Sequence, residues 1–116
     1  MPPTLPHTPL SFYRSSSCRE PVREWLKISP IADRRAVGLD LMRVQFRWPV
    51  GTPLCRALGD GLWGVRSTLP SKRIACVIFC FAEKVLVELH AFIKKTQKTP
   101  AADLAIVRER MKEILQ

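Results

Sequence analysis

Three apolar segments separated by very short connections constrain the fold of this chain more than any other feature. Residues 62–69, 73–81 and 85–93 each have the length and composition of a strand. Parallel neighbours would need a crossover of about a dozen residues or more, so such short connections allow only antiparallel pairing. The middle segment is apolar on both faces, as in a strand covered by helices. The sequence therefore predicts an antiparallel β-meander.

Two helices are predicted before this meander. Ser17 and Glu20 match the capping box that begins a helix. Its core-facing residues would be Val22, Trp25 and Leu26. Ser29-Pro30 is expected to end this helix and to cap a second one that extends to about Phe46. The second helix would bury Val37, Leu41 and Val44.

The remaining segments complete an α+β fold. Residues 47–61 are rich in glycine and proline and are expected to form an irregular loop, whereas residues 12–14 could form a short strand. A C-terminal helix begins after Thr99-Pro100 and turns Leu104, Val107, Met111 and Leu115 toward the core. We predict two N-terminal helices packed on the meander, plus this last helix. Residues 1–10 read as a flexible, proline-rich tail and residues 11–116 as a single domain.

Charge points to an anionic partner. The chain carries a net charge of +9, and residues 62–100 hold seven basic and two acidic side chains. The lysine cluster Lys94, Lys95 and Lys98 directly follows the last apolar segment. Each ammonium that meets a phosphate releases condensed counterions, so nucleic acid is the first candidate.

The expected hairpin register gathers more cations at the same place. With Thr68 opposite Arg73, Arg66 and Arg73 lie on one face of the sheet, beside the lysine cluster. A three-residue bulged loop would break this inference. Basic residues at strand ends commonly form a solvated rim. Like charges drawn from three strands cost free energy, however, which favours an anionic ligand. His90 could be a core or a functional imidazole.

The sequence lacks the motifs of the common enzyme classes, of metal sites and of membrane segments. The sequence holds no P-loop, dinucleotide fingerprint or nucleophile motif. Its four cysteines show no metal-ligand spacing with the two histidines, so we expect no metal and buried free thiols. The N-terminus has no signal-peptide pattern, and the longest apolar run, residues 74–82, is far short of the ~20 residues that span a bilayer. We expect a cytoplasmic protein with no membrane partner.

If this protein is an enzyme, its catalytic side chains must be arginines and lysines. RNA strand cleavage suits it, because the neighbouring 2′-OH attacks the phosphorus and the substrate supplies its own nucleophile. The protein then orients the backbone and stabilises the extra negative charge of the transition state. A lysine crowded by other cations loses its proton more easily and could accept the 2′ proton. No cofactor is needed.

Three stretches carry a resemblance to a known family. They are SCREPVREWLK at 17–27, GDGLW at 59–63 with VRS at 65–67, and HAFIKKTQKTP at 90–100, the most specific of them. They resemble the phage-derived, HigB-like branch of the RelE/ParE toxin superfamily, over residues 12 to about 115. The resemblance implies a RelE-like toxin of a type II toxin–antitoxin module. It also implies ribosome-dependent mRNA cleavage (an mRNA interferase), without metal or cofactor. The implied partner is a helix-turn-helix, HigA-like antitoxin in a heterotetramer.

The resemblance also implies site residues. Carried over by position, the matching cations are Arg66, Arg73, Lys94, Lys95 and Lys98. We expect Arg66 and Arg73 to hold the scissile phosphate and Lys95 to accept the proton, as the catalytic set. RNA binding would fall to Lys94, Lys98 and Lys72.

The sequence departs from the family pattern at two places. Gly64 stands where a glutamate is usual before Val-Arg, and Ser71-Lys72 stands where an Asp-Gly turn is typical. The loss of the glutamate could alter how Arg66 is oriented. Two alternatives therefore stay open: a ParE-like toxin that poisons DNA gyrase by protein contact, and an inactive nucleic-acid-binding module.

Overall fold

The computed structural model describes residues 8–48, 54–95 and 98–115. Its elements in chain order are β1 (Leu10–Phe12), α1 (Pro21–Ile28), α2 (Ile31–Arg47), β2 (Cys55–Gly59), β3 (Leu62–Thr68), β4 (Ile74–Ala82), β5 (Val85–Lys94) and α3 (Ala101–Leu115). The five strands form one sheet in the order β1-β5-β4-β3-β2. β1 runs parallel to β5, whereas all the other neighbours are antiparallel.

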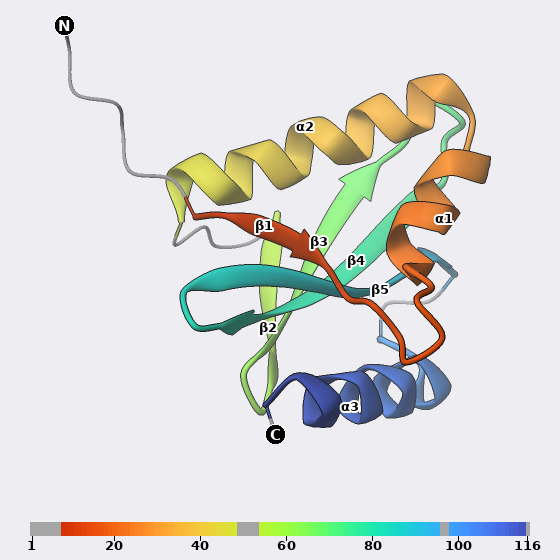
Figure 1. Cartoon of the computed structure of the whole chain (residues 1–116). Helices are drawn as coiled ribbons and strands as arrows, with labels where there is room; N and C mark the ends of the chain where they lie inside the picture. Colours follow the sequence, from red (N-terminus) through yellow and green to blue (C-terminus); the bar gives the residue numbers. More distant parts are fainter. Residues whose placement is uncertain (1–7, 49–53, 96–97, 116) are drawn as a thin grey trace, which may run out of the picture.

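The sheet separates two helical layers. Figure 1 shows α1 and α2 on one face of the sheet and α3 on the other. Val37 of α2 and Phe79 of β4 belong to the core under the first layer, and Ile78 and Val107 belong to the core under α3. Ile78 and Phe79 are adjacent in β4 and both fully buried, as predicted for a central strand covered on both sides.

The predicted class is confirmed, but the sheet is larger than the predicted meander. β3, β4 and β5 form the three-stranded antiparallel unit expected from the sequence. A strand precedes the two helices and adds in parallel to β5, so the sheet is mixed. At the other edge, β2 lies within the segment predicted to be irregular. Gly59 and Gly61 have positive φ and supply the tight turn into β3, so they join strands rather than prevent them.

The predicted helix caps are wrong in detail. Ser17 does not cap α1, because Glu20 is the N-cap residue and Pro21 is the first helical residue. The backbone N–H of Glu20 instead donates to the Glu24 carboxylate at 3.1 Å. The Ser29 hydroxyl donates back to the carbonyl of Trp25 at 2.8 Å, which closes α1 rather than opening α2.

The predicted core positions that the structure describes are confirmed. Val22, Val37, Leu41, Val44 and Val107 are buried. Trp25, Leu26, Leu104 and Met111 are partly buried against the core. The side chain of Leu115 lies outside the described residues, as do residues 1–7, 49–53, 96–97 and 116.

The chain joins the sheet before the end of the predicted tail. The backbone N–H of Thr8 donates to the carbonyl of Gln45 at 2.9 Å, and the N–H of Leu86 donates to the carbonyl of Pro9 at 2.8 Å. The short strand predicted at 12–14 therefore lies slightly earlier, at Leu10–Phe12. Over the described ranges, no helix has the length and apolar character needed to cross a membrane.

Candidate functional site

The β3–β4 hairpin has a three-residue loop. The N–H of Leu69 donates to the carbonyl of Arg73, and the N–H of Lys72 donates to the carbonyl of Leu69, each at 2.9 Å. Lys72 has a φ of 67°, in the left-handed region. This is the pattern of a β-turn followed by one left-handed residue. Thr68 consequently pairs with Ile74 rather than with Arg73.

This register separates the two predicted catalytic arginines. A one-residue shift moves a side chain to the other face of a sheet. Arg66 pairs with Cys76, on the face that α3 covers. Arg73 belongs to the opposite face, under α1 and α2. The prediction that Arg66 and Arg73 share one face is therefore wrong, because the loop is the bulged type.

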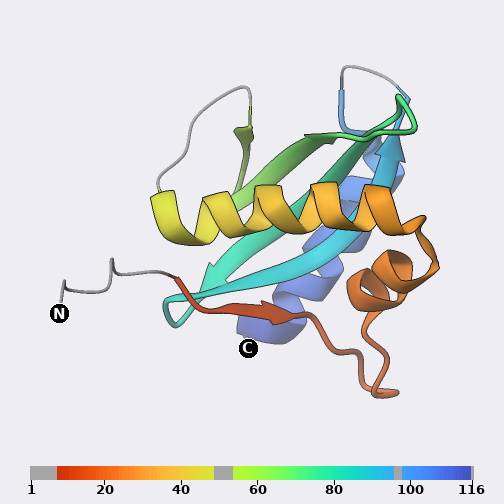
Figure 2. The ribbon, with the colours of Figure 1, turned by 90° about the horizontal axis from the view of Figure 1, so that it is seen from above.

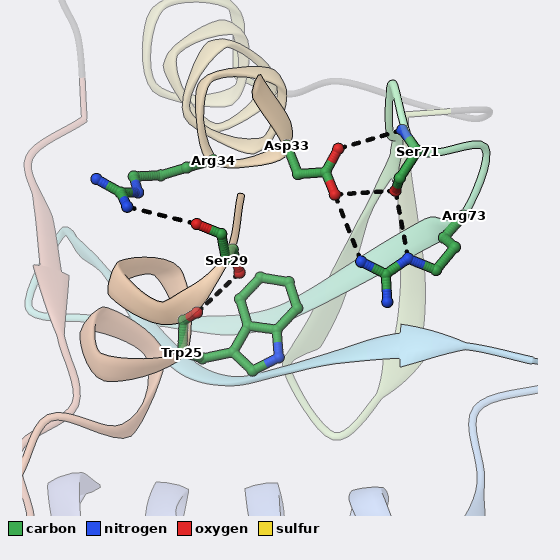
Figure 3. Close-up of polar contacts among 6 residues, drawn as sticks. All are labelled: Trp25, Ser29, Asp33, Arg34, Ser71 and Arg73. Carbon is green, nitrogen blue, oxygen red and sulfur yellow. Dashed lines mark hydrogen bonds and ion pairs between the residues drawn. The ribbon is translucent and has the colours of Figure 1, made fainter. Parts of the chain in front are cut away.

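Arg73 is held by the β3–β4 loop and by α2. Asp33 of α2 is only 3% exposed. Its carboxylate accepts hydrogen bonds from the backbone N–H of Ser71 at 3.3 Å and from the Ser71 hydroxyl at 2.9 Å. The guanidinium of Arg73 lies 3.5 Å from the same carboxylate (Figure 3). The Arg73 side chain is 51% exposed, so screening weakens this ion pair, and the bonds to Ser71 fix the loop more firmly.

The opposite face of the sheet carries a second group of cations. Arg66, Cys76 and Phe92 are paired in one row across β3, β4 and β5, and Thr68, Ile74 and Lys94 form the next row. Paired residues lie on the same face, so Arg66 and Lys94 share it. Burial raises the pKa of the Cys76 thiol to about 11; the charge of Asp103 adds to that rise, and the charges of Lys94 and Arg66 oppose it.

Arg56 belongs to the same face and was missed by sequence reasoning. It pairs with Gly64, in the row next to that of Arg66. The loop prediction for 47–61 hid it, although Gly59-Asp60-Gly61 before a strand is a hairpin signal that could have revealed β2. We call Arg56, Arg66 and Lys94 the basic face.

Gly64 leaves room on the basic face. A Cβ atom there would lie 3.5 Å from the sulfur of Cys76 and 3.6 Å from Leu58, which are ordinary contacts. The glutamate that the family resemblance leads one to expect at this position would stand between Arg56 and Arg66. Position 64 therefore contributes no carboxylate to the basic face, although Asp40 of α2 lines a groove together with Arg66.

His90 connects β5 to α3. It pairs with Ile78 and stacks on Phe92, with ring centroids 5.5 Å apart. Its Nε2 donates to the Asp103 carboxylate at 2.6 Å, and Nη1 of Arg110 lies 3.5 Å from its Nδ1. Both ring nitrogens thus face residues of α3, which favours a structural role over that of a general base.

The other predicted lysines are exposed. Lys72 lies in the β3–β4 loop, Lys95 directly follows β5, and Lys98 precedes α3. Figure 2 shows the β3–β4 loop and the C-terminal end of β5 at the same end of the sheet, in agreement with the pairing of Ile74 and Lys94. The cations of the β3–β4 loop and those at the end of β5 therefore lie at the same end of the sheet, divided between its two faces. Thr96 and Gln97 of the lysine motif lie outside the described residues.

The cysteines are not bonded to one another. All four are free thiols; Cys55, Cys76 and Cys80 are buried as predicted, whereas Cys18 is exposed. Within the part of the chain that the structure describes, no three His, Cys, Asp or Glu side chains are grouped as a metal ion would require.

A family model for phage-derived Gp49-like proteins (DUF891) matches residues 24–112. The chain belongs to this family. The Gp49-like family is part of the RelE/HigB-type group of toxins from toxin–antitoxin systems, and membership suggests an antitoxin partner. The match runs from within α1 to within α3 and so includes the whole basic face. A search of curated proteins gave no match to this Gp49-like chain.

Proposed function

We propose that this protein is the toxin of a type II toxin–antitoxin module and that it cuts mRNA on the ribosome. The observation that carries the proposal is the basic face of a Gp49-like chain. Three cations from β2, β3 and β5 lie there on successive rows of one sheet face. Such a charge density, next to the half-buried ring of Phe92, suits an RNA backbone and an unstacked base.

The proposed reaction uses the substrate's own nucleophile. The 2′-oxygen forms a bond to the phosphorus and the bond to the 5′-oxygen breaks, which leaves a 2′,3′-cyclic phosphate and a 5′-hydroxyl. The 2′ proton passes to a base, for which Lys95 is our candidate, and a proton from solvent reaches the leaving oxygen. Arg66 and Lys94 stabilise the extra negative charge on the phosphoryl oxygens. The reaction requires neither a metal nor a cofactor.

We assign Arg73 a different task from the one expected of it. Its guanidinium faces Asp33 and Ser71 on the other side of the sheet, so we infer that it supports the β3–β4 loop. Lys72 at the tip of this loop and Lys98 before α3 then attract RNA without taking part in the chemistry.

The partner in this proposal is an antitoxin. A toxin of this kind is tolerated only when it is masked, and a helix-turn-helix, HigA-like dimer that binds two toxin chains would give a heterotetramer. The target is the translating ribosome, so we place the protein in the cytoplasm.

The decisive experiment maps RNA 5′ ends in bacteria after induction of the chain without a partner. New ends inside translated codons are expected with the wild type and with Lys112→Ala, a control cation at the far end of α3. They should be nearly absent with Arg66→Ala. A change in DNA supercoiling without new RNA ends would instead favour gyrase poisoning. RNA binding with neither effect would identify an inactive binding module.

A further inference from the structure

A cavity of about 770 Å³ lies between β2 and the start of α3. Its volume is within the range of sites that hold small molecules. The residues that line it include Arg56, Leu58, Lys98, Thr99, Pro100 and Leu104. The cavity thus brings together a strand that the sequence did not reveal and the segment from Lys98, the last residue of the lysine cluster, into α3.

The cavity has an apolar floor and a cationic rim. Leu58 and Leu104 are partly buried and pack against the core on the α3 side of the sheet. Arg56 is exposed, and two basic but no acidic residues are among those that line the cavity. An apolar surface bordered by cations fits a ligand with a flat apolar part and a negative charge.

The cavity meets the basic face at Arg56, which belongs to both. Arg56 pairs with Gly64 across β2 and β3. Leu58 reaches to within 3.6 Å of the position that a Cβ of Gly64 would take. Arg66 lies two residues further along the same strand and on the same face. A ligand in the cavity would therefore lie beside Arg56, one row of the sheet away from Arg66.

We propose that this cavity is a nucleobase subsite, which receives one unstacked base of a single-stranded RNA beside the phosphate held by Arg66. A nucleotide combines the two properties that the cavity matches, an apolar base and an anionic phosphate. Arg56 binds the phosphate of that nucleotide, and the base lies against Leu58 and Leu104. This inference rests on the proposed function, because it takes RNA as the ligand.

Two variants separate the base from the phosphate. Ala101→Phe changes an exposed residue at the first position of α3 that lines the cavity, so it fills the cavity and keeps every charge. Arg56→Ala removes one cation at an exposed position and leaves the cavity open. Lys112→Ala, which removes a cation from the other end of α3, is the control for both.

The probe is a short single-stranded RNA with every 2′-hydroxyl methylated, so that it cannot be cut. A set of the same RNAs has one base removed at each position in turn. Fluorescence anisotropy should show that Ala101→Phe weakens binding of the intact RNA about tenfold. It should have no effect on the RNA that lacks the base which enters the cavity. Arg56→Ala should reduce the slope of log K against log salt by about 0.7. Lys112→Ala should resemble the wild type in all three measurements.

Wild-type binding by both Ala101→Phe and Arg56→Ala, with folding confirmed by circular dichroism, would overturn the subsite. If both variants bind RNA like the wild type and the wild type cuts mRNA, the proposed function stands and only the subsite is wrong. If the wild type does not cut mRNA but the variants change RNA binding as expected, the subsite stands and the nuclease assignment falls. A weakening by Ala101→Phe that is equal for every RNA of the set would also contradict a base in the cavity.

Discussion

Arg66 and Arg73 lie on opposite faces of the sheet although only one short hairpin loop separates their strands. The left-handed backbone of Lys72 causes this, because it adds one residue to the loop and shifts the pairing of β4. Arg66 joins the basic face, whereas Arg73 faces Asp33. Replacement of the two arginines should consequently affect different properties, the cleavage rate for Arg66 and the stability of the fold for Arg73.

Arg66→Ala should reduce single-turnover cleavage on programmed ribosomes by about 100-fold, since it removes one preorganised charge from the transition state. Arg73→Ala should reduce cleavage much less and should lower the free energy of unfolding instead. Urea denaturation of both variants measures the second effect. A loss of cleavage with Arg73→Ala as large as with Arg66→Ala would mean that phosphate binds at the loop rather than on the basic face.

Asp33→Ala should destabilise the protein by about 1–3 kcal/mol, because the backbone N–H and hydroxyl of Ser71 lose their acceptor. Asp40→Ala on the same helix is the matched control. Asp40 pairs with Arg43, whose side chain is 58% exposed although that of Asp40 is only 13% exposed, so its loss should cost about 1 kcal/mol or less. Equal losses in the two variants, measured by urea denaturation, would show that Asp33 does not hold the loop.

Glu88→Gln should change how stability depends on pH. Glu88 is fully buried, its oxygens have no hydrogen-bond partner among the described residues, and burial raises its pKa to about 8. Between the ordinary carboxyl pKa of 4.5 and about 8, the folded protein keeps a proton that the unfolded chain releases. Wild-type stability should therefore fall across this window, by a few kcal/mol in order of magnitude.

The glutamine variant cannot lose that proton. Its free energy of unfolding should lie closest to that of the wild type below pH 4.5, and the difference should grow in its favour up to about pH 8. A constant difference between the two proteins across the window would show that Glu88 titrates alike in both states.

Lys84→Gly should stabilise the protein by about 0.5–1 kcal/mol. Glu83 and Lys84 form the two-residue turn between β4 and β5, and both have positive φ, of 49° and 67°. Side chains disfavour this conformation, whereas glycine adopts it readily. Lys112→Gly, the same change inside α3, should instead cost about 1 kcal/mol. Thermal unfolding of the two variants shows whether each substitution raises or lowers stability. A destabilised Lys84→Gly would contradict a left-handed backbone at Lys84.

The sequence by itself determined the class of the fold and the family to which the chain belongs. Apolar periodicity identified α1, α2, α3 and the meander, because burial of these faces is a local property of residue order. The positive charge and the lysine motif indicated an anionic ligand before any geometry was known. Val37 and Val107 were recognised as core residues for the same local reason.

Tertiary structure alone decided which of these cations share a face of the sheet. The register at Thr68 depends on one backbone conformation at Lys72, and that conformation is stabilised by bonds that Asp33 makes from a distant helix. β2 exists because its residues pair with β3 and Leu58 packs against the core, whereas the glycines at 59 and 61 resemble those of a loop. Arg56 could therefore not be placed beside Arg66 from the sequence. Several backbone conformations of these segments have nearly the same local free energy. Contacts between segments far apart in the chain stabilise one of them, so the local sequence pattern does not predict which one forms.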